Sequence, residues 1–382
     1  MTQQPVREAL PDRLRGIALL GIVVVNAAFL GISVDGFTAE SVDGVANRVT
    51  ALLVLTFAQG KFYLLFSFLF GYSSAFILRA NTKPHRRRYL RRLLALFLFG
   101  LAHAVFFFVG DILITYAILG LLLFTISRSS DRALRRWTTA AIAVAVFLIL
   151  AITSLAAAFP EDGSGGLEGL GSALATGSFA EASLARMEAL PTVLFSVVVL
   201  QGPMAFAAFV LGLRASRRRL LADPEANIDL WRKMSRWGWA IGLPLQAVAA
   251  GFQVSSIATG NPFSGFGALG LALGLATAPI LAAGYIGSIA LAIAKRPGFL
   301  SIMAPAGRMS LTVYIGESAL LSLVFTAYGL GYFGKWGAFP VVLASIASWA
   351  LLSLFALWWM SRFRQGPLER AMALLTGKAA SR

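Results

Sequence analysis

Residues 137–158, WTTAAIAVAVFLILAITSLAAA, decide the fold class of this chain because none of them carries a charged side chain. A helix that crosses a bilayer needs about 20 consecutive, mostly apolar residues. Similar apolar blocks recur along all 382 residues, of which 58% are hydrophobic and 13% are charged. Soluble domains carry about 25% charged residues. The sequence therefore predicts an all-α protein, a polytopic bundle of transmembrane helices that forms one membrane domain over residues 1–382.

The apolar blocks predict about ten spans. They cover residues 16–33, 61–79, 90–108, 111–127, 137–158, 191–213, 237–256, 266–293, 307–329 and 338–360. The segment 41–60 is also apolar, but polar residues interrupt it, and we interpret it as an interfacial or re-entrant helix. If it crossed the membrane, there would be eleven spans and every later segment would change sides. The loop 159–190 divides the chain into two five-span parts, 1–158 and 191–382.

Lysine and arginine residues are concentrated in alternate loops of this arrangement. With the N-terminus inside, 29 of the 33 basic residues fall in the inside segments. The other four are Arg48, Lys61, Arg186 and Lys335. Cytoplasmic loops of membrane proteins carry such an excess. The pattern predicts that both chain ends are cytoplasmic and that the loop 159–190 is extracytoplasmic. It also explains the net charge of +16 without nucleic acid as a partner.

The composition excludes several kinds of site. The chain has no cysteine and two histidines, so disulfides, thiolate nucleophiles and histidine-rich metal clusters are excluded, and we expect no metal. The first apolar block lacks a cleavage site after it, and we interpret it as a retained signal anchor. We expect a multi-pass protein of a bacterial plasma membrane, surrounded by membrane lipids. Phosphate-binding loops, nucleophile elbows and nucleic-acid motifs are absent from the sequence. Association with a second copy stays open.

Arg15 and Asn26 are two polar candidates of the first span. Eleven residues of helix advance by about 16 Å and turn by about 1100°, close to three full turns, so both side chains share one face. Arg15, with Arg13 beside it, either anchors the topology by reaching lipid phosphate or binds an anionic cytoplasmic ligand. Asn26 either serves a ligand or bonds a neighbouring helix.

His103 and Asp111 flank the predicted turn between the third and fourth spans. A helical hairpin this short makes the two spans antiparallel neighbours, so the two side chains can face each other near the outer leaflet. A carboxylate that orients an imidazole makes it a stronger base. The alternatives are a structural pair, or Asp111 as the N-cap of the fourth span.

Glu317 lies near the middle of the ninth predicted span. An ionisable group at that depth is costly and is usually functional. It is expected to be protonated, to pair with a base such as His103, or to line a polar cavity. Lys61, at the outer start of the second span, is expected to extend toward the membrane surface.

Several segments resemble the YeiB family of bacterial membrane proteins of unknown function. They are residues 15–26, 61–71, 91–113, 306–312 and 366–370, and they follow the family order over nearly the whole chain. The family is grouped with a transmembrane acyltransferase superfamily, which includes the membrane acyltransferase-3 proteins and the lysosomal heparan glucosaminide acetyltransferase.

The resemblance implies that acyl-CoA is a co-substrate. In acyltransferase-3 proteins an arginine begins the first helix and a histidine follows eleven positions later. Arg15 matches that arginine, but Asn26 stands where the histidine would be, and His103 is the substitute base. Glu317 stands where the family pattern has glutamine.

Three functions remain open on the sequence. The first is transfer of an acyl group from cytoplasmic acyl-CoA to an unidentified extracytoplasmic or envelope acceptor. His103, Asp111, Asn26 and Glu317 would be catalytic, and Arg15 and Arg13 would bind the donor. The second is proton-coupled transport, or a channel, for a small solute or lipid. The third is a scaffold without chemistry.

Overall fold

The computed structural model describes residues 8–79, 82–158 and 167–377, and within these ranges the chain forms helices and no strands. The first half contains α1 (Ala9–Gly31), α2 (Val45–Phe57), α3 (Phe62–Leu78), α4 (Lys83–Phe106), α5 (Leu113–Ile126), α6 (Asp131–Ala158), α7 (Glu168–Thr176) and α8 (Phe179–Leu200). The second half contains α9 (Gly202–Arg217), α10 (Ile228–Trp237), α11 (Leu243–Ala258), α12 (Gly265–Lys295), α13 (Ala304–Arg308), α14 (Ser310–Phe325), α15 (Ala338–Met360) and α16 (Pro367–Leu375). Short 3-10 turns occur at Glu40–Val42, Glu225–Asn227 and Ser301–Met303, and a π-helical turn, Gly238–Gly242, joins α10 to α11.

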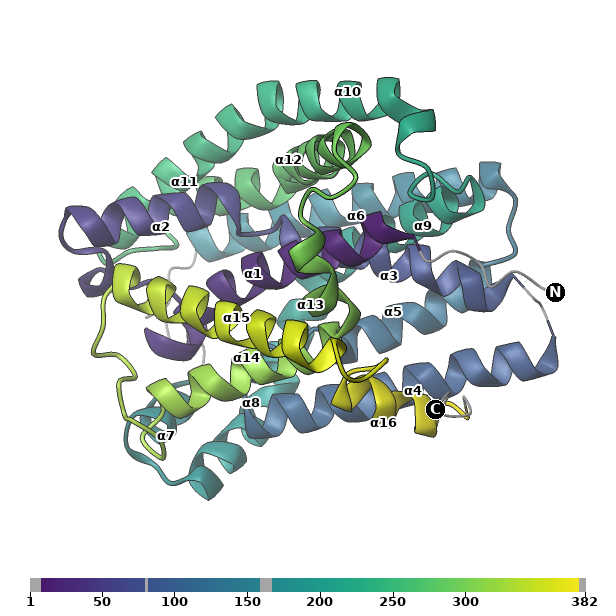
Figure 1. Cartoon of the computed structure of the whole chain (residues 1–382). Helices are drawn as coiled ribbons and strands as arrows, with labels where there is room; N and C mark the ends of the chain where they lie inside the picture. The colour runs from purple at the N-terminus through teal and green to yellow at the C-terminus, as the bar shows by residue number, and fades with distance from the viewer. Residues whose placement is uncertain (1–7, 80–81, 159–166, 378–382) are drawn as a thin grey trace.

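The helices have the lengths and composition of a membrane bundle. In the described ranges, eight helical segments are long and apolar enough to cross a bilayer, and the bent pair of Ser301–Arg308 and α14 makes a ninth. The apolar α5, with 14 residues, is shorter than a usual span. Figure 1 shows α1 beginning and α15 ending toward the same end of the bundle, where α16 also lies. The chain is therefore a polytopic helical membrane protein, and its first and last described residues lie on one side, as the charge pattern predicts; this arrangement requires α5 to cross as a tenth span.

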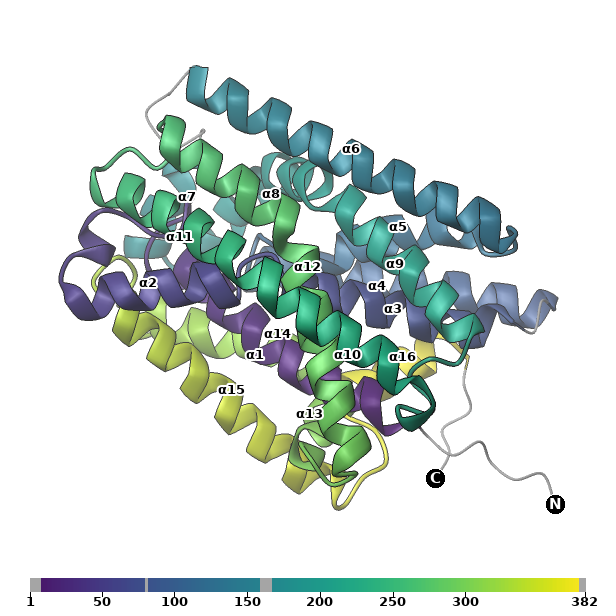
Figure 2. The ribbon, with the colours of Figure 1, turned by 90° about the horizontal axis from the view of Figure 1, so that it is seen from above.

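The bundle is organised around α1. This helix contacts α3, α14 and α15 along its length, and 61% of its most apolar stretch is buried. By contrast, α6 lies along one edge of the molecule in Figure 2, and only 22% of its apolar stretch is buried. The polar residues of α1 therefore face protein, whereas most of α6 faces lipid.

Two glycines bring α3 and α9 into close contact. A Cβ atom added at Gly71 would lie 2.0 Å from the carbonyl oxygen of Phe209. One added at Gly212 would lie 2.0 Å from the carbonyl oxygen of Phe68. Only glycine permits this approach of two backbones, and small residues commonly mediate such contacts in membranes. Gly71 ends the Leu65–Gly71 segment of the predicted family motif.

The segment 41–60 differs from its predicted form. It forms α2, which packs against α11 and α15 and continues into α3 after a short break. Residues 45–78 together make one candidate span, so the eleventh crossing is not formed. Lys61 lies in the break and is 0% exposed, and its ammonium donates to the carbonyl of Leu55 at 2.8 Å. The prediction that Lys61 extends toward the membrane surface was wrong, because the break leaves a carbonyl that the ammonium satisfies.

The boundary between the two predicted halves also differs. Residues 159–166 lie outside the described residues, but the rest of the predicted loop 159–190 contains α7 and the first half of α8. Pro191 is inside α8 and does not end the loop. The predicted span 191–213 contains a break at Gln201, between α8 and α9. Hydropathy missed these helices because their polar residues lower the average over a window.

The last two predicted spans agree with the structure in different degrees. The span 338–360 coincides with α15. The span 307–329 begins instead as a separate short helix, α13, and turns by 83° before α14. Gly307 is buried where α13 packs on α1, and an added Cβ there would lie 1.8 Å from the carbonyl oxygen of Asp12.

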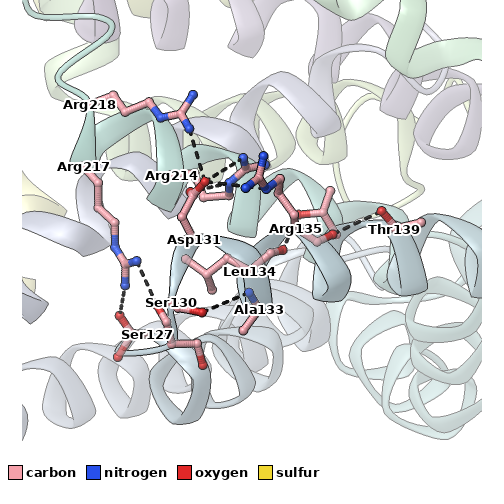
Figure 3. Close-up of polar contacts among 12 residues, drawn as sticks. Ser127, Ser130, Asp131, Ala133, Leu134, Arg135, Thr139, Arg214, Arg217 and Arg218 are labelled. Carbon is pink, nitrogen blue, oxygen red and sulfur yellow. Dashed lines mark hydrogen bonds and ion pairs between the residues drawn. The ribbon is translucent and has the colours of Figure 1, made fainter.

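Arginines of α9 tie its end to the turn between α5 and α6 (Figure 3). Asp131 accepts from Arg214 at 2.9 Å and from Arg218 at 3.2 Å. Arg217 donates to the carbonyls of Ser127 and Ser129 at 2.6 and 2.9 Å. These basic residues belong to the inside segments of the charge pattern, so we call this end of the bundle the inner end.

Candidate functional site

His103 and Asp111 form a buried pair at the turn between α4 and α5. The Nδ1 atom of His103 lies 2.7 Å from Oδ2 of Asp111, and both side chains are 0% exposed. The other carboxylate oxygen of Asp111 accepts the backbone N–H of Ile114 at 2.8 Å. Asp111 therefore orients the imidazole and also caps the start of α5, so the sequence predicted both of its contacts.

Aromatic rings surround the imidazole of His103. Its centroid lies 4.8 Å from the ring of Tyr314 and 6.3 Å from the ring of Phe108. The Nε2 atom is buried and has no hydrogen-bond partner among the described residues. Since Nδ1 faces a carboxylate, Nδ1 carries the proton in the neutral ring and Nε2 carries the lone pair. The pair thus has the electronic arrangement of a general base.

An arginine-lined cavity of about 480 Å³ opens at the inner end of the bundle. Its basic lining residues come from α1, α4, α13 and the segment after α15. They are Arg15, Arg88, Arg92, Arg308 and Arg364. Glu369 is the only carboxylate among the described residues that line it. We call it the inner cavity. Its charge suits a ligand with several negative charges, because guanidinium groups bind phosphate through paired hydrogen bonds.

Glu369 holds α16 over this cavity. Its carboxylate accepts the backbone N–H groups of Leu311 and Thr312 at 2.7 and 3.2 Å and the hydroxyl of Thr312 at 2.6 Å. The Thr312 hydroxyl in turn accepts the N–H of Leu368 at 3.1 Å. A carboxylate at a helix N-terminus is favoured by the helix dipole. These contacts join two segments of the family signature, 306–312 and 366–370.

A second cavity of about 400 Å³ lies in the outer half of the bundle, and we call it the outer cavity. Aromatic and aliphatic side chains of α1, α3, α8 and α12 make up most of its wall. Asn26, Gln59, Tyr63, Arg186 and Gln201 supply polar groups. A mostly apolar cavity with a few polar groups is typical of small-molecule sites.

The two cavities are adjacent inside the bundle and share part of their walls. Ile22, Ile112 and Tyr314 line both of them, and we call these three residues the junction. Arg15 lines the inner cavity and Asn26 the outer one. The shared face of α1 predicted from their spacing is therefore one wall of both cavities. The junction ring of Tyr314 is also the ring that packs against His103, at an interplanar angle of 46°.

Four predicted site residues lie away from the cavity walls, namely Arg13, Glu317, His103 and Asp111. Arg13 is 8% exposed and donates to the carbonyl of Phe299 at 2.8 Å. Glu317 is 1% exposed, and neither of its carboxyl oxygens has a partner among the described residues. The predicted pairing of Glu317 with His103 is not formed: Nδ1 bonds Asp111, and Nε2 has no partner among the described residues. His103 itself lies behind Tyr314 and lines neither cavity.

Three residues near the site were not predicted from the sequence. The hydropathy of the sequence does not distinguish Tyr314 from the apolar residues around it. Tyr314 does precede Glu317 by three residues, and it therefore lies on the same side of the helix. Arg308 and Arg364 were counted only among the basic residues that set the orientation in the membrane, yet they line the inner cavity together with Arg15. Their common position could not be found from spacing, since they lie on separate segments.

The fold and these cavities define a helical membrane protein with an inner and an outer cavity. Residues 215–378 match the family model described as "Protein of unknown function (DUF418)". Uncharacterized protein YxaH of Bacillus subtilis is 30% identical, with 94% of this chain and 91% of that protein covered. Uncharacterized protein YeiB of Escherichia coli is 27% identical, with 97% and 96% covered. The chain belongs to this DUF418 family. No solved structure matches it significantly.

Proposed function

We propose that this protein is an acyltransferase of the bacterial plasma membrane. It moves an acyl group from cytoplasmic acyl-CoA to an acceptor at the outer face. The observation that carries the proposal is that an arginine-lined inner cavity and an outer cavity share a wall at Tyr314, whose ring packs against His103 of the His103–Asp111 pair. Donor and acceptor can thus reach one place from opposite sides of the membrane, which removes much of the entropic barrier to transfer.

The donor binds with its phosphates among the arginines of the inner cavity. Arg15 and Arg92 lie on facing helices, and both line this cavity. The thioester then reaches the junction, next to Tyr314. An acceptor hydroxyl or amine attacks the thioester carbon, the carbon–sulfur bond breaks, and CoA leaves as the thiol after proton transfer. For this step the side chain of Tyr314 moves aside, His103 takes the acceptor proton on Nε2, and Asp111 stabilises the imidazolium.

Asn26 and the outer cavity serve the acceptor side. Asn26 lines the outer cavity and is polar in an otherwise apolar stretch of α1. Its amide can donate a hydrogen bond to the carbonyl oxygen as that oxygen becomes negative in the transition state. This interaction needs the acyl group to pass the junction, because Asn26 lies about one helical turn beyond Ile22.

The replacement His103→Ala tests this proposal. We expect loss of acyl transfer by at least about a hundredfold, because general bases contribute that much or more. The assay follows release of CoA thiol from acetyl-CoA by the purified protein in nanodiscs with bacterial envelope extract as acceptor. Leu101→Ala on the same helix is the control, since Leu101 is 37% exposed on the lipid side and should leave transfer unchanged. A fully active His103→Ala protein would overturn the mechanism.

Proton-coupled transport is the second candidate, and the unpartnered carboxyl of Glu317 favours it. A buried carboxyl without a partner is suited to exchange a proton as two cavities open alternately. Solute uptake that collapses with the proton gradient and with Glu317→Gln, without thiol release from acetyl-CoA, would support transport over transfer.

A further inference from the structure

A second basic pocket adjoins the inner cavity at the surface of the inner end. It measures about 460 Å³, and we call it the rim pocket. Its polar and basic lining is Lys83, His85, Arg87, Arg88, Arg91 and Thr376. Arg88 and Thr376 also line the inner cavity. No carboxylate is among the described residues that line the rim pocket.

The regular spacing of α4 produces the two spaces. Lys83, Arg87 and Arg91 are four residues apart and therefore form one row along the helix. Arg88 and Arg92 form a second row, about 100° further round, and line the inner cavity. Arg87 and Arg91 are exposed, whereas Arg88 of the second row is half-buried and lines both spaces. One helix thus presents cations to two adjacent anion sites.

The excess of basic residues in cytoplasmic loops explains why α4 begins with several cations. It does not explain why these cations line two adjacent cavities. An inside loop needs positive charge, and any scattered positions would supply it. Here the charges line two cavities that share a wall, and the end of α16 closes the wall at Thr376. The helix α16 itself is held in place by the contacts of Glu369 with the start of α14.

We propose that the rim pocket binds the 3′-phosphate of CoA and so selects CoA among phosphorylated donors. This inference rests on the proposed acyl-CoA donor. CoA carries a pyrophosphate and a 3′-phosphate on opposite sides of one ribose, so it needs two neighbouring anion sites. The inner cavity takes the pyrophosphate, Arg88 lies between the two groups, and Lys83, Arg87 and Arg91 take the 3′-phosphate.

Dephospho-CoA, which lacks only the 3′-phosphate, tests the assignment. The affinities of the full-length protein for CoA and dephospho-CoA are measured by calorimetry in nanodiscs of phosphatidylcholine. We expect CoA to bind at least about tenfold more tightly, because charge-assisted hydrogen bonds to phosphate are strong. The double variant Arg87→Gln with Arg91→Gln should bind both compounds equally, with an unchanged affinity for dephospho-CoA.

The matched control is Arg132→Gln with Arg136→Gln. These arginines have the same four-residue spacing, are exposed at the start of α6, and line neither basic space. This variant loses the same charge and should keep the preference for CoA. Equal binding of CoA and dephospho-CoA by the unaltered protein, or an unchanged preference in the Arg87 and Arg91 variant, overturns the inference and leaves the acyl-CoA donor intact. Failure to bind either compound overturns the proposed function as well.

The phosphate of an anionic lipid could occupy the same basic pocket, so the measurement is repeated with phosphatidylglycerol in the nanodiscs. Retention of the preference for CoA supports the assignment to the 3′-phosphate. Loss of the preference in the anionic bilayer assigns the rim pocket to lipid headgroups and overturns the inference.

Discussion

The imidazole of His103 is held by contacts on three sides. Asp111 bonds Nδ1, Tyr314 covers one face of the ring, and Phe108 lies edge-on. Burial of a polar nitrogen without a partner is costly, yet Nε2 has none among the described residues. A structural histidine would gain stability by bonding both nitrogens. The absence of a hydrogen-bond partner for Nε2 among the described residues therefore favours a role in which a substrate supplies that partner.

Asp111→Asn separates the orientation of His103 from the stability of the turn. The asparagine oxygen can still accept the N–H of Ile114, but its amide donates to Nδ1 and moves the ring proton to Nε2. We expect transfer to fall by at least about a hundredfold, with little change in the thermal unfolding midpoint. Both quantities are measured on the purified protein. A lower midpoint with unchanged transfer would instead indicate a scaffold.

Single residues were predictable where local geometry alone brings them together. The short turn between spans sufficed to pair His103 with Asp111, and helical spacing sufficed to align Arg15 with Asn26. Tyr314 and Arg308 were not predictable, because their roles depend on how α13 and α14 pack against α1. Lys61 was predicted wrongly, because a break in the backbone offered it a buried carbonyl.

At the scale of elements, the docking of α16 onto α14 depends on the carboxyl group of Glu369. Burial raises the pKa of Glu369 above its ordinary value of 4.5, although hydrogen bonds from Thr312 and Leu311 oppose the rise. The docked helix therefore binds a proton more tightly than the undocked helix does. Docking is strongest below pH 4.5, and part of its free energy is lost as pH rises through the raised pKa.

Hydrogen exchange of residues 367–375 measures this dependence. After correction for intrinsic rates, we expect α16 to open more often at pH 7.5 than at pH 5. Glu369→Gln keeps an acceptor for the N–H groups of Leu311 and Thr312 but does not titrate, so its opening should not change with pH. Equal opening of unaltered α16 at both pH values would contradict the expectation.

The close contact between α3 and α9 predicts that Gly212→Ala destabilises the protein, and a second glycine, Gly251, serves as the comparison. A methyl group at Gly212 would meet backbone atoms of Phe68 and Tyr72 at 2.0 and 2.7 Å, which cannot move independently of α3. Gly212→Ala should destabilise the protein by about 1–3 kcal/mol or more, measured as thermal unfolding in detergent. Gly251→Ala on α11, with no atom within 4 Å of the added carbon, should be neutral or slightly stabilising. Equal midpoints for the two variants would rule out the close contact.

At the scale of the whole molecule, hydropathy and charge predicted the helical class and the sides of the chain ends. The positions of several element boundaries were not predictable. The break at Gln201 and the 83° bend before α14 arise from packing against neighbours, which a window average does not register. The cavities were also beyond the sequence, because their walls combine segments hundreds of residues apart.

Cysteine labelling tests the orientation of the bundle. The chain has no cysteine, so each substitution gives one label without background. Ser172→Cys on α7 should react with an impermeant maleimide in intact cells. Ala226→Cys, in the loop before α10, should react only after the membrane is opened. Both residues are exposed. The reverse pattern would invert the assignment of the inner and outer ends.

The junction also has an electrical consequence. Where solvent enters a cavity, the insulating layer of the membrane becomes thinner, so the transmembrane voltage falls mainly across the remaining barrier. Here that barrier is as thin as the side chains of Ile22, Ile112 and Tyr314. A voltage of 100 mV changes the energy of one elementary charge by about 2.3 kcal/mol over the full drop. Because the cell interior is negative, this concentrated field draws negative charge outward past Tyr314.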